Sequence, residues 1–103
     1  MNINIKTQNL DLTPALREFI EEKIGSLKKI VSKWEEKGSV MIDFEASRIT
    51  NHHHKGNVFY AEINLSLGGK ELRAERSAED IREAITMVKN LIKEEIVKLK
   101  KDK

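Results

Sequence analysis

The sequence contains no cysteine, a single proline and few aromatic residues, which make up 5% of the chain. Without cysteine the chain cannot form disulfides, bind metals through thiolates or use a thiol nucleophile, which fits a reducing compartment. It also lacks a basic-then-apolar leader and any long uncharged run. We therefore expect a soluble, cytoplasmic protein that has no membrane partner.

Motifs of catalysis and nucleotide binding are missing as well. No serine or threonine lies in a recognisable nucleophile elbow, and no phosphate-binding glycine loop follows a predicted strand. Gly68 and Gly69 are better explained as a two-residue hairpin turn. We expect neither an enzyme nor a cofactor nor a small-molecule substrate.

The length of 103 residues predicts one domain that spans the whole chain, 1–103. Apolar residues alternate with polar ones over four stretches, which predicts strands at 2–7, 40–47, 58–67 and 70–76. Two stripes at helical spacing predict a helix over 14–36, capped by Thr13 with Pro14 in its first position, and a C-terminal helix. Ser77 and Asp80 are interpreted as the capping box of that second helix.

The order β-α-β-β-β-α predicts an α+β two-layer sandwich. Two helices are expected on one face of a four-stranded mixed sheet, while the other face is open to solvent. The first two strands are joined by a helical crossover, so we expect them to be parallel neighbours or near neighbours. The other connections are hairpins and predict antiparallel pairs.

The net charge is only +2 although 35% of the residues are charged, so the distribution of the charges matters more than their sum. On a helical wheel, Arg82, Lys89, Lys93 and Lys100 lie within roughly 40° of one another along a line of about 27 Å. The open face of the sheet is expected to carry mainly carboxylates. Basic candidates for binding a polyanion on the helical side are Arg17, Lys23, Lys28, Lys29, Arg82, Lys89, Lys93, Lys98 and Lys100.

A plain solvated face is the alternative interpretation of these helices. Several glutamates stand near the lysines and could pair with them along the helix. Arg17 and Lys28 are expected in the same position relative to the first apolar stripe, whereas Lys23 falls at its edge, where its stem can lie along apolar surface.

Three consecutive histidines, His52, His53 and His54, precede Lys55 between the second and third predicted strands. Consecutive side chains of an extended segment alternate, so a tetrahedral zinc site is not expected and no metal is predicted. A polar loop is one interpretation, and phosphate contacts from the histidines and Lys55 are the other. Phosphate binding by the histidines would tighten as the pH falls through ~6.5.

Three motifs in this order resemble a known family: "TPALR" in the first helix, "LRAE" at the end of the hairpin and "EDIREAI" at the start of the last helix. The sequence is similar to the ribosome hibernation-promoting factors and ribosome-associated inhibitors. The resemblance implies a domain that binds the small ribosomal subunit in the channel for messenger and transfer RNA and thereby inhibits translation under stress. It also implies ribosomal RNA contacts from the two helices, with Arg17, Lys23, Lys29 and Lys98 at matching positions.

Longer relatives carry a C-terminal domain that pairs ribosomes, and the resemblance implies a short form that lacks it and is monomeric when free. The sequence also departs from the family pattern, because Arg82 stands where many members have tyrosine, and Leu91, Glu94 and Glu95 stand where basic residues are common. A protein-interaction module that uses the acidic sheet face or a sheet edge is the alternative function.

Overall fold

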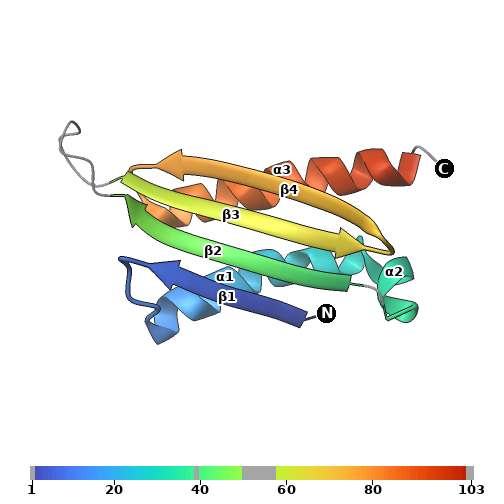
Figure 1. Ribbon diagram of the computed structural model, residues 1–103, viewed down its shortest axis with the longest axis horizontal. Helices are drawn as coiled ribbons and strands as arrows, with labels where there is room; N and C mark the ends of the chain where they lie inside the picture. The colour runs from blue at the N-terminus through green and yellow to red at the C-terminus, as the bar shows by residue number, and fades with distance from the viewer. Residues whose placement is uncertain (1, 39, 50–57, 102–103) are drawn as a thin grey trace.

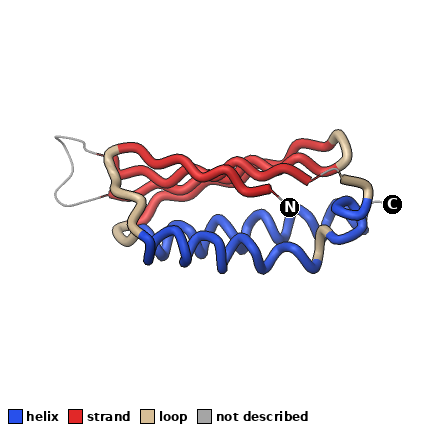
Figure 2. Tube along the Cα trace, turned by 90° about the horizontal axis from the view of Figure 1, so that it is seen from below, coloured by secondary structure: helices blue, strands red, loops and turns tan. Residues whose placement is uncertain are grey.

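The computed structural model describes residues 2–38, 40–49 and 58–101. It is a two-layer α+β sandwich in which all helices cover one face of one sheet (Figures 1 and 2). The predicted order is confirmed. The elements are β1 (Asn2–Gln8), α1 (Pro14–Gly25), the 3-10 helix η1 (Ser26–Lys29), α2 (Ser32–Glu36), β2 (Val40–Ile49), β3 (Val58–Leu67), β4 (Lys70–Ala78) and α3 (Ile81–Lys101).

The strands are arranged in the order β1-β2-β3-β4. β1 runs parallel to β2, as the crossover predicts, and the β2–β3 and β3–β4 pairs are antiparallel. Their register places apolar residues side by side: Ile5 stands opposite Phe44, and Phe44 opposite Ile63. These rows form the inner face of the sheet.

The core lies between the inner sheet face and the helices. Burial of each aliphatic side chain in this core contributes about 1.5–3 kcal/mol, so the stability of the domain rests on the core. This core combines the inner face of the sheet with the two apolar stripes of the helical segments. Its fully buried members include Ile20 and Ile24 of α1, Ile63 and Leu65 of β3, and Ile85, Val88, Ile92 and Ile96 of α3.

The predicted single helix over 14–36 is wrong. The α-helix ends at Gly25, and a 3-10 turn and the short α2 follow it. The Ser26 hydroxyl donates to the Lys23 carbonyl at 2.6 Å, a local bond of the kind that competes with regular helix, and both Ile30 and Val31 donate to the Leu27 carbonyl. Because the apolar spacing of three and four residues suits both helix types, the buried stripe survives the break.

The predicted capping box at Ser77 is also wrong. Ser77 belongs to β4 and pairs with Tyr60. Asp80 alone caps α3, since its Oδ1 accepts the Arg82 backbone N–H at 2.9 Å. β4 continues to Ala78, which pairs with Phe59 of β3, and the helix starts only afterwards.

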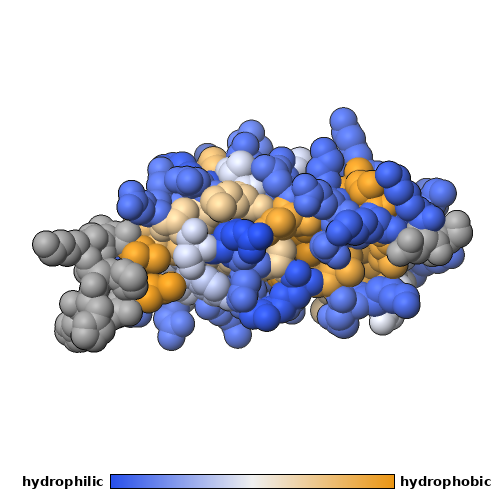
Figure 3. Space-filling view, turned by 90° about the horizontal axis from the view of Figure 1, so that it is seen from above, coloured by the Kyte–Doolittle hydropathy of each residue, from blue (hydrophilic) through white to orange (hydrophobic). Residues whose placement is uncertain are grey.

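α1 and α3 lie side by side and point the same way. Both begin at the end of the sheet where β2 ends and β3 begins (Figure 1). On the side of β4 and α3, patches of apolar surface alternate with hydrophilic side chains (Figure 3). Half-buried Leu72 and Leu91 are among the apolar residues of these two elements. Within the described residues, no helix is long and apolar enough to span a membrane.

The β3–β4 turn supplies a stability test. Gly68 has φ +51°, and a Cβ there would lie 3.1 Å from Trp34 Cδ1, whereas Gly25 is helical, with φ −60°, and has open space beside it. Gly68→Ala should lower the free energy of unfolding by about 1–2 kcal/mol through the left-handed backbone alone. Gly25→Ala should raise it by about 0.4–1 kcal/mol. Urea unfolding of both variants checks the opposite signs, and equal effects would contradict this account.

Candidate nucleic-acid interface

The basic residues of α3 lie along one uninterrupted helix of 21 residues. Arg82, Lys93 and Lys100 are exposed and Lys89 is half-buried, so all four reach the surface of the helical layer. The rise of eighteen residues gives the line a length of about 27 Å. This part of the predicted surface keeps the geometry that the sequence indicated.

The basic residues of the first helical segment are arranged differently from the prediction. Arg17 lies on α1, but Lys28 and Lys29 lie on η1, where 3.0 residues make a turn in place of 3.6. The helical wheel therefore does not relate Lys28 to Arg17. All three side chains are exposed.

Few of these cations form an ion pair with another described residue. We call nine of the basic residues on the two helical segments the helical basic surface: Arg17, Lys23, Lys28, Lys29, Arg82, Lys89, Lys93, Lys98 and Lys100. Among the described residues, only Lys98 of this set forms an ion pair, with Glu95 at 3.8 Å. The other eight form no ion pair with a described residue, whereas a plain solvated face predicts pairs between the lysines and the nearby glutamates.

Two of these cations meet at one aromatic ring. Lys23 Nζ lies 5.5 Å and Arg82 Cζ 5.4 Å from the centroid of the Phe19 ring, both within the range of cation–π attraction. The stem of Lys23 is half-buried, as predicted. In the sequence, Phe19 is only one of the apolar residues at helical spacing that predict the first helix. The spacing of four residues between Phe19 and Lys23 was a usable signal, but nothing in the sequence places Arg82 beside them.

A second pair of this kind lies where β2 and β3 pair at their ends. Arg48 Cζ lies 5.7 Å from the centroid of the Phe59 ring, and the two residues stand opposite each other. Sequence reasoning missed Arg48 as a surface cation. The histidine segment lies beyond this pair along the chain; His52, His53, His54 and Lys55 are outside the described residues, and their role stays a prediction.

The open face of the sheet carries the opposite charge. In one row across the strands, Glu45, Glu62 and Glu75 stand opposite one another, and Lys6 of β1 continues the row. Asp43 and Glu71 belong to the same face. Five carboxylates therefore share this face with two cations, Lys6 and Arg73.

A hydrogen-bonded cluster joins two of these carboxylates. Arg73 Nη2 donates to Glu62 and to Glu75, each at 2.9 Å, and the Tyr60 hydroxyl is hydrogen-bonded to both carboxylates. Asn64 Nδ2 donates to Glu62 at 2.7 Å. Bonds from Arg73, Tyr60 and Asn64 lower the pKa of Glu62 to about 2, while burial and the two carboxylates raise the pKa of Tyr60.

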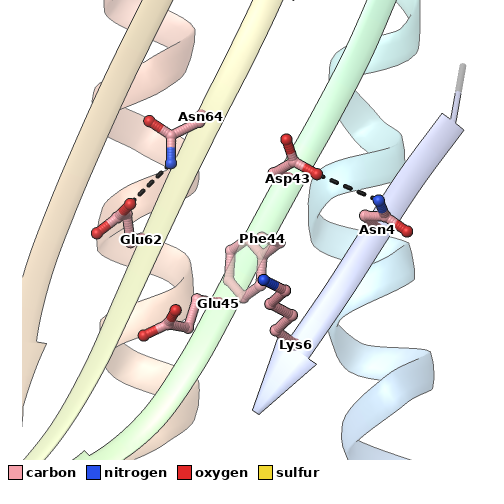
Figure 4. Close-up of a pocket in the computed structure, with 7 residues that line it drawn as sticks. All are labelled: Asn4, Lys6, Asp43, Phe44, Glu45, Glu62 and Asn64. Carbon is pink, nitrogen blue, oxygen red and sulfur yellow. Dashed lines mark hydrogen bonds between the residues drawn. The ribbon is translucent and has the colours of Figure 1, made fainter. Parts of the chain in front are cut away.

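The neighbouring part of the open face is hollowed (Figure 4). Its volume is about 350 Å³, and Asn4, Lys6, Asp43, Phe44, Glu45, Glu62 and Asn64 line it. Asp43 accepts from the Asn4 amide at 3.3 Å and Glu45 from the Ser47 hydroxyl at 3.1 Å, but neither forms an ion pair within the described chain. Among all the described residues, no group of three or more histidine, aspartate or glutamate side chains is placed to hold a metal ion.

Fold and surface together define a small α+β domain with a basic helical layer and an acidic sheet layer. The sequence matches a family described as "Sigma 54 modulation protein / S30EA ribosomal protein" over residues 3–103. The chain belongs to this family, and the resemblance seen in its motifs is confirmed.

Named relatives of this chain are bacterial. It is 30% identical to the "Ribosome hibernation promotion factor" of Bacillus subtilis over 100 residues, which are 97% of this chain and 49% of that protein. It is 29% identical to the "Ribosome-associated factor Y" of Haemophilus influenzae over 99 residues, which are 96% of this chain and 82% of that protein. The chain thus spans about half the length of the Bacillus relative and most of the Haemophilus relative.

Solved structures share the fold. The N-terminal domain of Thermus thermophilus Protein Y superimposes with a TM-score of 0.72 at 21% identity, covering 96% of this chain and 99% of that one. A ribosomal subunit interface protein from Coxiella burnetii gives 0.71 at 19% identity, over 97% and 98% of the two chains.

Acid should weaken the cluster around Glu62. A carboxylate with a pKa lowered from 4.5 to about 2 stabilises the fold above pH 4.5 and loses that contribution as the pH falls to 2. We expect Glu62→Gln to lower the free energy of unfolding by about 1–2 kcal/mol at pH 7, allowing for solvent screening, and the gap to the wild type to close toward pH 2. Urea unfolding from pH 7 to pH 2 measures the difference in the free energy of unfolding between the variant and the wild type. Glu71→Gln, on the same face but outside the cluster, is the control, and a gap that persists at pH 2 would refute the account.

Proposed function

We propose that this chain binds the small ribosomal subunit through ribosomal RNA and inhibits translation by occupying the channel for messenger and transfer RNA, as a cytoplasmic hibernation factor. It would act by steric occlusion, without catalysis or a cofactor. The observation that carries the proposal is the helical basic surface, in which eight of nine cations form no ion pair with the described residues.

The electrostatics of RNA binding explain why free cations matter. A lysine or arginine that neutralises a phosphate releases condensed counterions, which drives association without reading the sequence. A cation already paired with a carboxylate must first give up that partner. Eight of the nine cations of the helical basic surface form no ion pair with a described residue and need no such exchange, so the two-helix layer can follow an RNA backbone directly.

The relatives support the ribosome as the partner. Their names connect them with ribosome hibernation and ribosome association, and the matched region covers 97% of this chain in the Bacillus protein. We propose that residues 1–103 suffice for this binding as one domain. Activities that belong to the remaining half of the Bacillus protein are not part of the proposal.

The acidic sheet face supports a second candidate, a protein-interaction module. Asp43 and Glu45 border a hollow and form no ion pair with the described residues, so a cationic protein segment could bind there. The two functions use opposite faces of the domain. Substitutions on one face at a time therefore separate them.

Neutralising the α3 line should weaken ribosome binding. We expect Lys89→Gln, Lys93→Gln and Lys100→Gln together to reduce affinity for purified small subunits tenfold or more, roughly, and to lower the salt slope of log affinity by about 2–3. Co-sedimentation at 50–200 mM salt, roughly the range in which such contacts are lost, measures both quantities.

The matched control carries the same change in net charge elsewhere. Lys6, Lys33 and Lys70, which lie on the open sheet face, on α2 and at the β3–β4 turn, are replaced by glutamine together. This variant should bind like the wild type. A wild type that does not sediment with small subunits would overturn the proposed function, and equal losses in both triple variants would reduce it to a general effect of charge.

A further inference from the structure

The start of α3 and the first turns of α1 meet at Phe19, a half-buried side chain that packs against the core. The two helices begin at the same end of the sheet and lie side by side (Figure 1). Lys23 belongs to the same helix as Phe19, whereas Arg82 comes from the first turn of α3. The ring therefore connects charges from two separate elements.

The two cations share the Phe19 ring as a common neighbour. Because Nζ lies 5.5 Å and Cζ 5.4 Å from the same centroid, the two charges can be at most about 11 Å apart. In water, long basic side chains sample many rotamers, and binding a phosphate has to order them. A ring that already attracts both side chains removes part of this entropic cost.

Carboxylates do not compete for these two charges. Glu22 and Glu83 are their immediate neighbours in sequence, yet neither Lys23 nor Arg82 forms an ion pair with a described residue. Asp80 is nearby but accepts the backbone N–H of Arg82 and so serves the start of the helix. The charges are held in place by an uncharged group and remain available to an anion.

We propose that Phe19 is a positioning residue that holds Lys23 and Arg82 as a two-helix clamp for backbone phosphates of RNA. The inference rests on the proposed function and names the part of the helical basic surface that is organised before RNA binds. Phe19 itself acts through the two cations and needs no contact with RNA. The other basic residues of that surface lack such an organiser among the described residues.

Binding of purified small ribosomal subunits tests the clamp. Phe19→Leu keeps an apolar side chain but removes the ring, and it should weaken binding about threefold to tenfold. Phe19→Tyr keeps the ring and should restore most of the affinity. Leu91→Ala, which trims a half-buried residue on the β4 side of α3, serves as a control for a general loss of packing and should bind like the wild type.

A double-mutant cycle separates positioning from packing. In the Lys23→Gln, Arg82→Gln background, Phe19→Leu should cause no further loss, because the residues through which it acts are gone. The same loss in both backgrounds would show that Phe19 merely supports the fold and would overturn the clamp. If Phe19→Leu bound small subunits with wild-type affinity, the clamp would also be wrong, but the proposed function would be unaffected. If the wild-type protein bound no small subunits, both the proposed function and the clamp would be wrong.

NMR of the free wild-type protein keeps the inference testable if Phe19→Leu does not fold. Ring currents of Phe19 should move the Lys23 ε-methylene and Arg82 δ-methylene proton signals upfield of their usual positions. Signals at ordinary positions would show that the side chains do not lie over the ring, and the clamp would be wrong.

Discussion

Burial of one face of the sheet against two parallel helices is the constraint on which the other features of the domain depend. Successive residues of a strand point to opposite faces, so packing Ile42, Phe44 and Ile63 inward fixes Asp43, Glu45 and Glu62 outward. A slip of the register by one residue would bring these carboxylates into the core and expose the aliphatic residues. The acidic face is therefore specified by the same packing that stabilises the fold.

The sheet layer and the helical layer differ in how far their charged side chains are paired with opposite charges. On the sheet, Arg73 bridges Glu62 and Glu75, and Tyr60 adds hydrogen bonds to both, so part of the negative charge is compensated inside the face. On the helices the cations extend outward with almost no compensation among the described residues. A domain with one partly compensated acidic face and one basic face has a preferred orientation in the field of a polyanion, since only the basic side attracts it.

Sequence reasoning succeeded where a local pattern has one structural meaning. Alternation predicted the four strands, and the helical crossover predicted that β1 and β2 are parallel. It failed where two structures share a pattern. Apolar spacing of three and four residues suits α and 3-10 turns alike, so the break at Ser26 was missed, and Ser77 reads as a cap although pairing with Tyr60 extends β4 through it. Contacts between separate helices, such as Arg82 with Phe19, have no local signal at all.

The contact between Phe19 and Arg82 links the helical basic surface to the core. Phe19 is packed against the buried stripe of α1, and Arg82 follows the residue where α3 begins, so their distance is set by how the two helices sit on the sheet. Close-packed cores transmit small displacements instead of absorbing them. Any change that shifts α1 against α3 must therefore alter the spacing of Lys23 and Arg82. In such a domain the core does more than keep the chain folded, because it also determines where two of the surface charges lie.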